Sequence, residues 1–157
     1  MPMKRILLFL LTIAAALFLW TGCAKAPPKE ANLAKVMDSM KQKITNTEMM
    51  DLSSKDLKPN LGVDAKDVKQ FAAYVDSTGT KGDEILLFEG TDDGAADRIE
   101  EKLNDRYRQK ETEMKDYLPE EYAMLQKCKV ERDGNFAAMI VSPQYEELEQ
   151  IYHSALK

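Results

Sequence analysis

Glu84-Ile85-Leu86-Leu87-Phe88-Glu89-Gly90, followed by Thr91-Asp92-Asp93, is the stretch of sequence that decides the fold. Its four consecutive apolar residues between two glutamates predict a central strand over residues 84–89 that is covered on both faces. Gly90 ends this strand, and the next three residues supply a capping oxygen and two carboxylates for the amino end of a helix. The sequence therefore predicts a buried strand that leads directly into a helix.

This helix is expected to run to about residue 117, because apolar residues recur along it at helical spacing. Its charged residues fall mostly outside that stripe, so we expect a solvated amphipathic layer rather than a ridge that binds nucleic acid. Pro119 cannot continue the helix but suits the first turn of another, which is predicted to reach about Gln126. The apolar stripe of the long helix consists of Ala96, Ile99, Leu103, Tyr107, Met114 and Tyr117.

Two hairpins are predicted, one on each side of these helices. The first joins residues 71–76 to residues 84–89, and the second joins residues 127–132 to residues 135–141 through an Asp133-Gly134 turn. A last helix follows Ser142-Pro143. We therefore expect an α+β fold of ββαββα type, with a four-stranded antiparallel sheet packed against helices. The predicted strand order is 1-2-4-3, because the second strand of each hairpin is the more continuously apolar.

The segment before the first hairpin is predicted to begin with a further helix at about Asn32, which can act as its N-cap. Residues 45–63 lack a sustained period and are predicted to form a loop with short helical pieces. Asp64 can then cap a single helical turn before the first strand. A methionine stripe of Met37, Met40, Met49 and Met50 could form an adaptable binding groove, although such stripes are more often core packing.

The amino-terminal residues predict export from the cytoplasm. Lys4 and Arg5 precede an apolar run, residues 6–20, that is typical of a secretion signal. A retained anchor helix is the less favoured alternative, because spanning a bilayer requires about 20 apolar residues. Leu19-Trp20-Thr21-Gly22-Cys23 resembles the bacterial lipobox, with Trp20 standing where an aliphatic residue is usual. The resemblance implies that Cys23 receives a diacylglyceryl group and becomes the new amino terminus.

Three regions are therefore expected: a lipoprotein signal peptide (residues 1–22), a lipidated cysteine with a proline-rich tether (23–31), and one α+β domain (32–157). Removing residues 1–22 takes away Lys4 and Arg5, which leaves 22 minus 2, or 20, basic residues against 27 acidic ones. Anionic lipid repels such a surface mildly. We therefore expect attachment to the outer face of the cell membrane through acyl chains such as palmitate on Cys23.

Composition and motifs exclude several classes of protein. A net charge of -5 argues against a nucleic-acid partner, because phosphate binding needs a concentrated basic face. Two cysteines and one histidine exclude a zinc finger or a disulfide scaffold. The sequence has no glycine-rich phosphate loop, nucleophile elbow or histidine pair. It therefore predicts no catalytic residue, no metal ligand and no cofactor, and we expect a monomer.

Some polar residues leave alternatives open. His153 could contact a partner or a ligand, although a histidine near the end of a helix more often packs at an edge. Glu146, Glu147 and Glu149 could attract a cation weakly, but acids near a helix start normally form a solvated face. Cys128 is expected on the buried face of a strand, because apolar and charged residues alternate around it.

Several segments taken together resemble one known family. These are the lipobox, Leu61-Gly62-Val63-Asp64, the strand from Asp83 to Phe88, the aspartate-rich helix start and Asp116-Tyr117-Leu118-Pro119-Glu120-Glu121. Over about residues 50–157 and the leader, the chain resembles an uncharacterised family of small lipoproteins from Gram-positive, Firmicutes-type bacteria. The soluble part of that family is a domain of unknown function. The resemblance implies location and fold, with no activity or cofactor.

We therefore expect a membrane-anchored, non-enzymatic lipoprotein of the cell envelope that binds an envelope protein, a wall polymer or a small ligand. The alternative is an envelope hydrolase in which Asp83, Asp92 or Asp93 holds a captured metal ion. A concave pocket in which carboxylates converge from different elements would favour that alternative. A structural spacer without a ligand is a third hypothesis.

Overall fold

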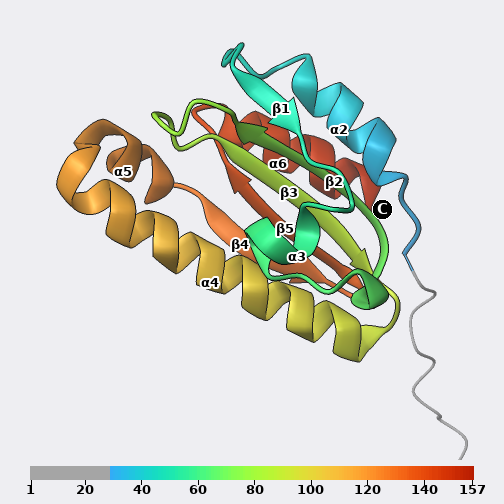
Figure 1. Cartoon of the computed structure of the whole chain (residues 1–157). Coiled ribbons are helices and arrows are strands. Elements are labelled where there is room, and N and C mark those ends of the chain that lie inside the picture. The colour runs from blue at the N-terminus through green and yellow to red at the C-terminus, as the bar shows by residue number, and fades with distance from the viewer. Residues whose placement is uncertain (1–28) are drawn as a thin grey trace, which may run out of the picture.

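The computed structural model describes residues 29–157, which form a five-stranded antiparallel sheet with helices on both faces (Figure 1). Helix α4 crosses one face of the sheet, whereas α2 and α6 cover the other face. In chain order the elements are α2 (Leu33–Lys41), β1 (Met49–Asp51), α3 (Leu57–Leu61), η2 (Ala65–Asp67), β2 (Val68–Asp76), β3 (Glu84–Gly90), α4 (Asp93–Tyr117), α5 (Pro119–Leu125), β4 (Lys129–Asp133), β5 (Phe136–Val141) and α6 (Tyr145–Ala155).

Strand β3 lies at the centre of the sheet, as its continuous apolar run predicts. Every residue of β3 is buried, and the strand pairs with β2 on one side and β5 on the other. Phe88 of β3 stands opposite Phe71 of β2, and their rings stack with centroids 5.9 Å apart. A strand covered on both faces needs no polar alternation, which is why its sequence identifies it so clearly.

The turn from β3 into α4 is tightly packed. The Asp92 carboxylate accepts a hydrogen bond from the Ala95 backbone N–H at 2.8 Å and so caps the helix. A Cβ atom at Gly90 would lie 2.6 Å from the Ala96 backbone nitrogen, so this position has no space for a side chain. The glycine is therefore required by the close approach of the helix to the end of the strand.

Two residues of α4 differ from the predicted pattern. Tyr117, placed on the apolar stripe by its spacing, is 83% exposed at the end of the helix. Lys110, placed among the solvated residues, is buried, and its ammonium lies 2.7 Å from the carboxylate of the buried Glu84. The helix continues beyond the sheet at its carboxyl end, so Tyr117 finds no apolar surface to cover.

The sheet has five strands instead of the predicted four. Residues 49–51 form the edge strand β1, which pairs with β2, and its addition makes the strand order β1-β2-β3-β5-β4. The remaining four strands keep the predicted adjacency. A three-residue edge strand is too short to show a period of two in the sequence, and its partly exposed residues resemble a loop. Helix α3 is one of the short helical pieces expected in this region.

The second hairpin turns one residue later than predicted. Asp133 of β4 pairs with Phe136 of β5, so the two loop residues are Gly134 and Asn135. Gly134 has a φ of +60°, and no residue other than glycine has a positive φ in the described chain. Glycine at the first loop position is the pattern of a type II′ turn, whereas the predicted Asp133-Gly134 loop would place both residues at positive φ.

The methionine stripe does not form one surface. Met37 and Met40 are buried against the core, whereas Met50 lies on the edge strand and is 48% exposed. The packing explanation therefore holds for the first two methionines. Among residues 29–157, no helix is long and apolar enough to cross a membrane.

Candidate functional site

A groove lies between α5 and the start of α6 and encloses about 820 Å³. We call this cavity the α5–α6 groove. Its charged lining residues are mostly acidic. They are Glu120 and Glu121 from α5, Lys127 from the following turn, and Glu146 and Glu147 from α6. The groove therefore presents more negative than positive charge to a ligand.

Local sequence explains why acidic residues line both sides of the groove. Pro119 begins α5, and the two glutamates that follow occupy the first turn of that helix. Glu146 and Glu147 occupy the first turn of α6 in the same way. Acidic side chains are favourable at these positions because the amino end of a helix carries partial positive charge. The orientation of the two helices then brings both acidic turns to one groove.

Internal contacts hold part of this acidic charge in place. The Gly82 backbone N–H donates to Glu121 Oε2 at 2.7 Å, which ties α5 to the residues before β3. Lys43 lies 2.7 Å from Glu147, but both side chains are about half exposed. Exposed ion pairs contribute little energy, so a cationic ligand could replace Lys43 at small cost.

Asp83 is buried at the amino end of β3, beside Gly82, and lines a second cavity of about 500 Å³. Its Oδ1 atom has no hydrogen-bond partner among the described residues. Burial raises the pKa of Asp83, and the nearby negative charge of Glu121 raises it further. At a given pH, the structure therefore favours the protonated, uncharged form of Asp83 more than it is favoured in an aspartate of ordinary pKa.

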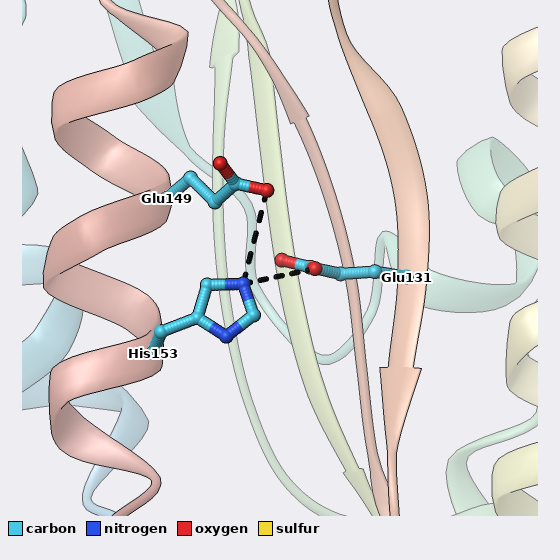
Figure 2. Close-up of side chains that lie close together, drawn as sticks. All are labelled: Glu131, Glu149 and His153. Atoms are coloured by element: carbon cyan, nitrogen blue, oxygen red, sulfur yellow. Dashed lines mark hydrogen bonds and ion pairs between the residues drawn. The ribbon is translucent and has the colours of Figure 1, made fainter.

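A second cluster of polar residues lies between β4 and α6, where Glu131, Glu149 and His153 point toward one another (Figure 2). His153 Nε2 lies 3.0 Å from Glu131 Oε2 and 3.8 Å from Glu149 Oε1. One potential ligand atom from each residue lies within 4.8 Å of the other two. We call these three residues the β4–α6 cluster, and their geometry is suited to holding a metal ion.

Two further side chains orient Glu149 within this cluster. The Tyr145 hydroxyl donates to Glu149 Oε1 at 2.8 Å, and Lys129 Nζ lies 2.6 Å from the same oxygen. The hydrogen bond from Lys129 lowers the pKa of Glu149, and that from Tyr145 lowers it further. Lys129 also lies 3.5 Å from Glu131, so its ammonium is a cation shared by both carboxylates.

The sequence shows part of this cluster but not all of it. Glu149 and His153 are four residues apart, which places them on one face of a helix. Glu131 belongs to a different element and is brought close by the packing of α6 against the sheet. The acidic run of α6 is therefore divided, since Glu146 and Glu147 line the groove while Glu149 joins the β4–α6 cluster.

The three aspartates considered for a hydrolase do not form one site. Asp92 caps α4, and the carboxylate of Asp93 lies 2.5 Å from the Arg132 guanidinium. Asp83 lies at the opposite end of β3 from these two residues. Because β3 separates them along its whole length, they cannot bind the same ion. In the described part of the chain, carboxylates from different elements come together instead in the α5–α6 groove and at the β4–α6 cluster.

The predictions for the two cysteines have different outcomes. Cys23 and its lipobox lie outside the described residues, so lipid attachment there remains an expectation. Cys128 is buried, as expected, although it immediately precedes β4 instead of lying within the strand. Burial raises the pKa of its thiol, which disfavours the reactive thiolate. The structure therefore indicates a core residue at position 128.

Comparison with known protein families matches residues 42–142 to the Domain of unknown function (DUF4358). The match begins after α2 and ends after β5, so it includes the whole sheet. Comparisons with curated proteins and with solved structures give no match. The family match covers more than half of the 157 residues and confirms the expected domain of unknown function. The chain therefore belongs to the DUF4358 family.

Proposed function

We propose that this protein is a lipid-anchored, non-catalytic binding module of the bacterial cell envelope that takes a positively charged ligand in the α5–α6 groove. The observation that carries the binding proposal is the acidic lining of this cavity of about 820 Å³, with glutamates from two helices facing one lysine. A groove with walls of one charge attracts ligands of the opposite charge. An envelope protein with a lysine-rich segment or a wall polymer with free amino groups would meet this requirement.

The tether proposal rests on the leader sequence. A basic start, an apolar run and a lipobox-like Leu19-Trp20-Thr21-Gly22-Cys23 together favour lipid attachment on the outer face of the membrane. Two acyl chains on Cys23 would anchor the domain stably, whereas a single chain gives only marginal binding. The folded region begins close behind, with α2 starting at Leu33. The domain would therefore work close to the membrane surface.

The tether is tested by replacing Cys23 with alanine. We expect the Cys23→Ala protein to leave the membrane fraction while keeping the circular dichroism spectrum of the native domain. Cys128→Ala serves as the matched control, because it removes the other thiol without touching the lipobox, and it should stay in the membrane fraction. A Cys23→Ala protein that remains in the membrane fraction would show that the leader is instead a retained anchor helix.

The groove is tested with a lysine-rich peptide as the probe, using isothermal titration calorimetry of the purified chain. Glu120→Gln and Glu146→Gln remove one charge from each wall of the groove. Each is expected to weaken peptide binding by a factor of about 1.4 to 5, because exposed charge pairs contribute about 0.2–1 kcal/mol. Glu101→Gln, an exposed substitution on α4, is the control and should bind as the unmodified chain does. Equal affinities for all of these chains would refute the groove as the binding site.

A further inference from the structure

We propose that the β4–α6 cluster is a zinc-binding site in which Glu131, Glu149 and His153 supply three ligands and water supplies the fourth. The three ligands lie outside the α5–α6 groove, with which the site shares only Tyr145, and the inference does not depend on the proposed function. Imidazole nitrogen and carboxylate oxygen are both ordinary ligands of Zn²⁺. Three protein ligands with an open fourth position are typical of zinc sites that can accept a further ligand.

Two of the three separations between ligand atoms are close to what zinc requires. Zinc–nitrogen and zinc–oxygen bonds of about 2.0–2.1 Å in a tetrahedron place neighbouring ligand atoms about 3.4 Å apart. His153 Nε2 lies 3.0 Å from Glu131 Oε2 and 3.8 Å from Glu149 Oε1, on either side of that value. The separation between the two carboxylate oxygens is no more than 4.8 Å, so rotation of the glutamate side chains can bring all three atoms to one ion.

The elements that carry these residues hold them together. Glu149 and His153 stand one turn apart on α6, with their ligand atoms on the side that faces β4 (Figure 2). Glu131 projects from β4 toward α6 and is mostly buried. The Tyr145 hydroxyl donates to Glu149 and so acts as a positioning residue for that carboxylate. Hydrogen bonds of this kind to a ligating side chain are a regular feature of metal sites.

Lys129 currently supplies the positive charge that the two carboxylates require. Its ammonium lies 2.6 Å from Glu149 and 3.5 Å from Glu131, near the position that the ion would take. The lysine side chain is 54% exposed and flexible, so it can move into water when a divalent ion arrives. Lys129 therefore competes with zinc instead of helping to bind it.

Tyr152 lies beside the cluster and packs against one of the proposed ligands. Its hydroxyl is buried and has no hydrogen-bond partner in the described part of the chain, and the residue is 1% exposed. Its ring meets the His153 ring edge to face, with the two ring centroids 5.7 Å apart. This contact helps to hold the imidazole of His153 beside the two carboxylates.

The proposal is tested by titrating the purified full chain in detergent with Zn²⁺ in competition with a chromophoric chelator. We expect one zinc ion per chain. Glu149→Gln and His153→Ala should each weaken that binding at least 100-fold, and Tyr145→Phe about tenfold. Glu101→Gln, on the other side of the sheet, is the control and should bind zinc unchanged. All of these chains keep both cysteines, so zinc held by a thiol would not respond to the substitutions.

The sharpest variant is Lys129→Met, which keeps the apolar stem and removes the competing charge. It should bind zinc about two- to fivefold more tightly than the unmodified chain, whereas histidine binding an ion at the surface by itself would be unaffected. Replacement of zinc by Co²⁺ should give the visible absorption of a four-coordinate ion, and this absorption should be lost in His153→Ala. A cooperative unfolding transition of each variant in the absence of metal shows that the substitution has left the fold intact. Unchanged zinc affinity in Glu149→Gln or in Lys129→Met would overturn the proposal.

Discussion

The buried charges beneath α4 allow a prediction about stability that can be worked through from the structure. Glu84 of β3 is 2% exposed at its side chain, and it faces Lys110, which is 7% exposed, and Arg106, which is 27% exposed. Lys110 lies 2.7 Å from the carboxylate and also donates to the Gly82 carbonyl. One buried carboxylate therefore compensates two cations, of which Lys110 has almost no access to water.

Glu84→Gln is expected to lower the free energy of unfolding by about 3 kcal/mol. Removing one partner of a buried ion pair costs about 3–5 kcal/mol, since it leaves the other charge uncompensated. We place the cost at the lower end because Arg106 can recover some hydration. Lys110→Met should cost only about 1.5 kcal/mol, the lower end for a hydrogen bond to a charged group, since Arg106 still compensates Glu84.

The double variant Glu84→Gln/Lys110→Met separates charge compensation from simple loss of contacts. It should be no less stable than Glu84→Gln alone, because the uncompensated cation is removed together with its partner. The stability of all three variants is measured by urea denaturation followed by circular dichroism at neutral pH. An unchanged slope of the unfolding free energy against urea concentration checks that the folded state stays compact. The reasoning would be refuted if Lys110→Met cost as much as Glu84→Gln, or if the two single costs were additive in the double variant.

Three further predictions follow from individual contacts. Gly90→Ala should destabilise the domain by about 1–3 kcal/mol in the same urea assay, because its Cβ would lie 2.6 Å from the Ala96 backbone nitrogen. A urea midpoint equal to that of the unmodified chain would contradict this packing. Cys128 should react slowly with a thiol reagent in the native state and rapidly in urea, because burial raises the pKa of its thiol, and fast native labelling would show that this region is open. The side-chain hydrogen bond from Arg98 lowers the pKa of Asp67 in the folded state. The pair should therefore stabilise the fold at pH values above the unfolded-state pKa of about 3.9, and this stabilisation should be lost as the pH falls through the folded-state pKa. Arg98→Met should therefore reduce the acid sensitivity of unfolding, and a pH profile identical to that of the unmodified chain would contradict the assignment.

The central part of the fold can be predicted from sequence because its signals are local. The apolar run of β3, the Asp92 cap and the proline that begins α5 each determine their own backbone through neighbouring residues. β1 is different, because three partly exposed residues have no period of their own and become a strand only by pairing with β2. The burial of Lys110 is equally invisible in the sequence, since it depends on Glu84 lying opposite in space.

The candidate sites show the same division between local and long-range information. The spacing of Glu149 and His153 places them on one helix face, but the position of Glu131 depends on the register of the second hairpin. The acidic first turns of α5 and α6 can be located along the chain, whereas their meeting in one groove depends on how the two helices pack. Sequence spacing therefore identifies candidate ligands within one element and misses those supplied by a neighbour.

By itself, the sequence determined the α+β class, the central strand β3, the caps and breaks of the helices, and the expectation of a lipid tether at Cys23. These features depend on residues close together in the chain, where hydrophobic periodicity, capping oxygens and fixed proline geometry act directly. Only the tertiary structure decided that a fifth strand closes one edge, that four glutamates share a groove, and that Glu131 meets Glu149 and His153. The physical reason is that these contacts depend on how separate elements pack against one sheet, and that packing is set by the whole buried core.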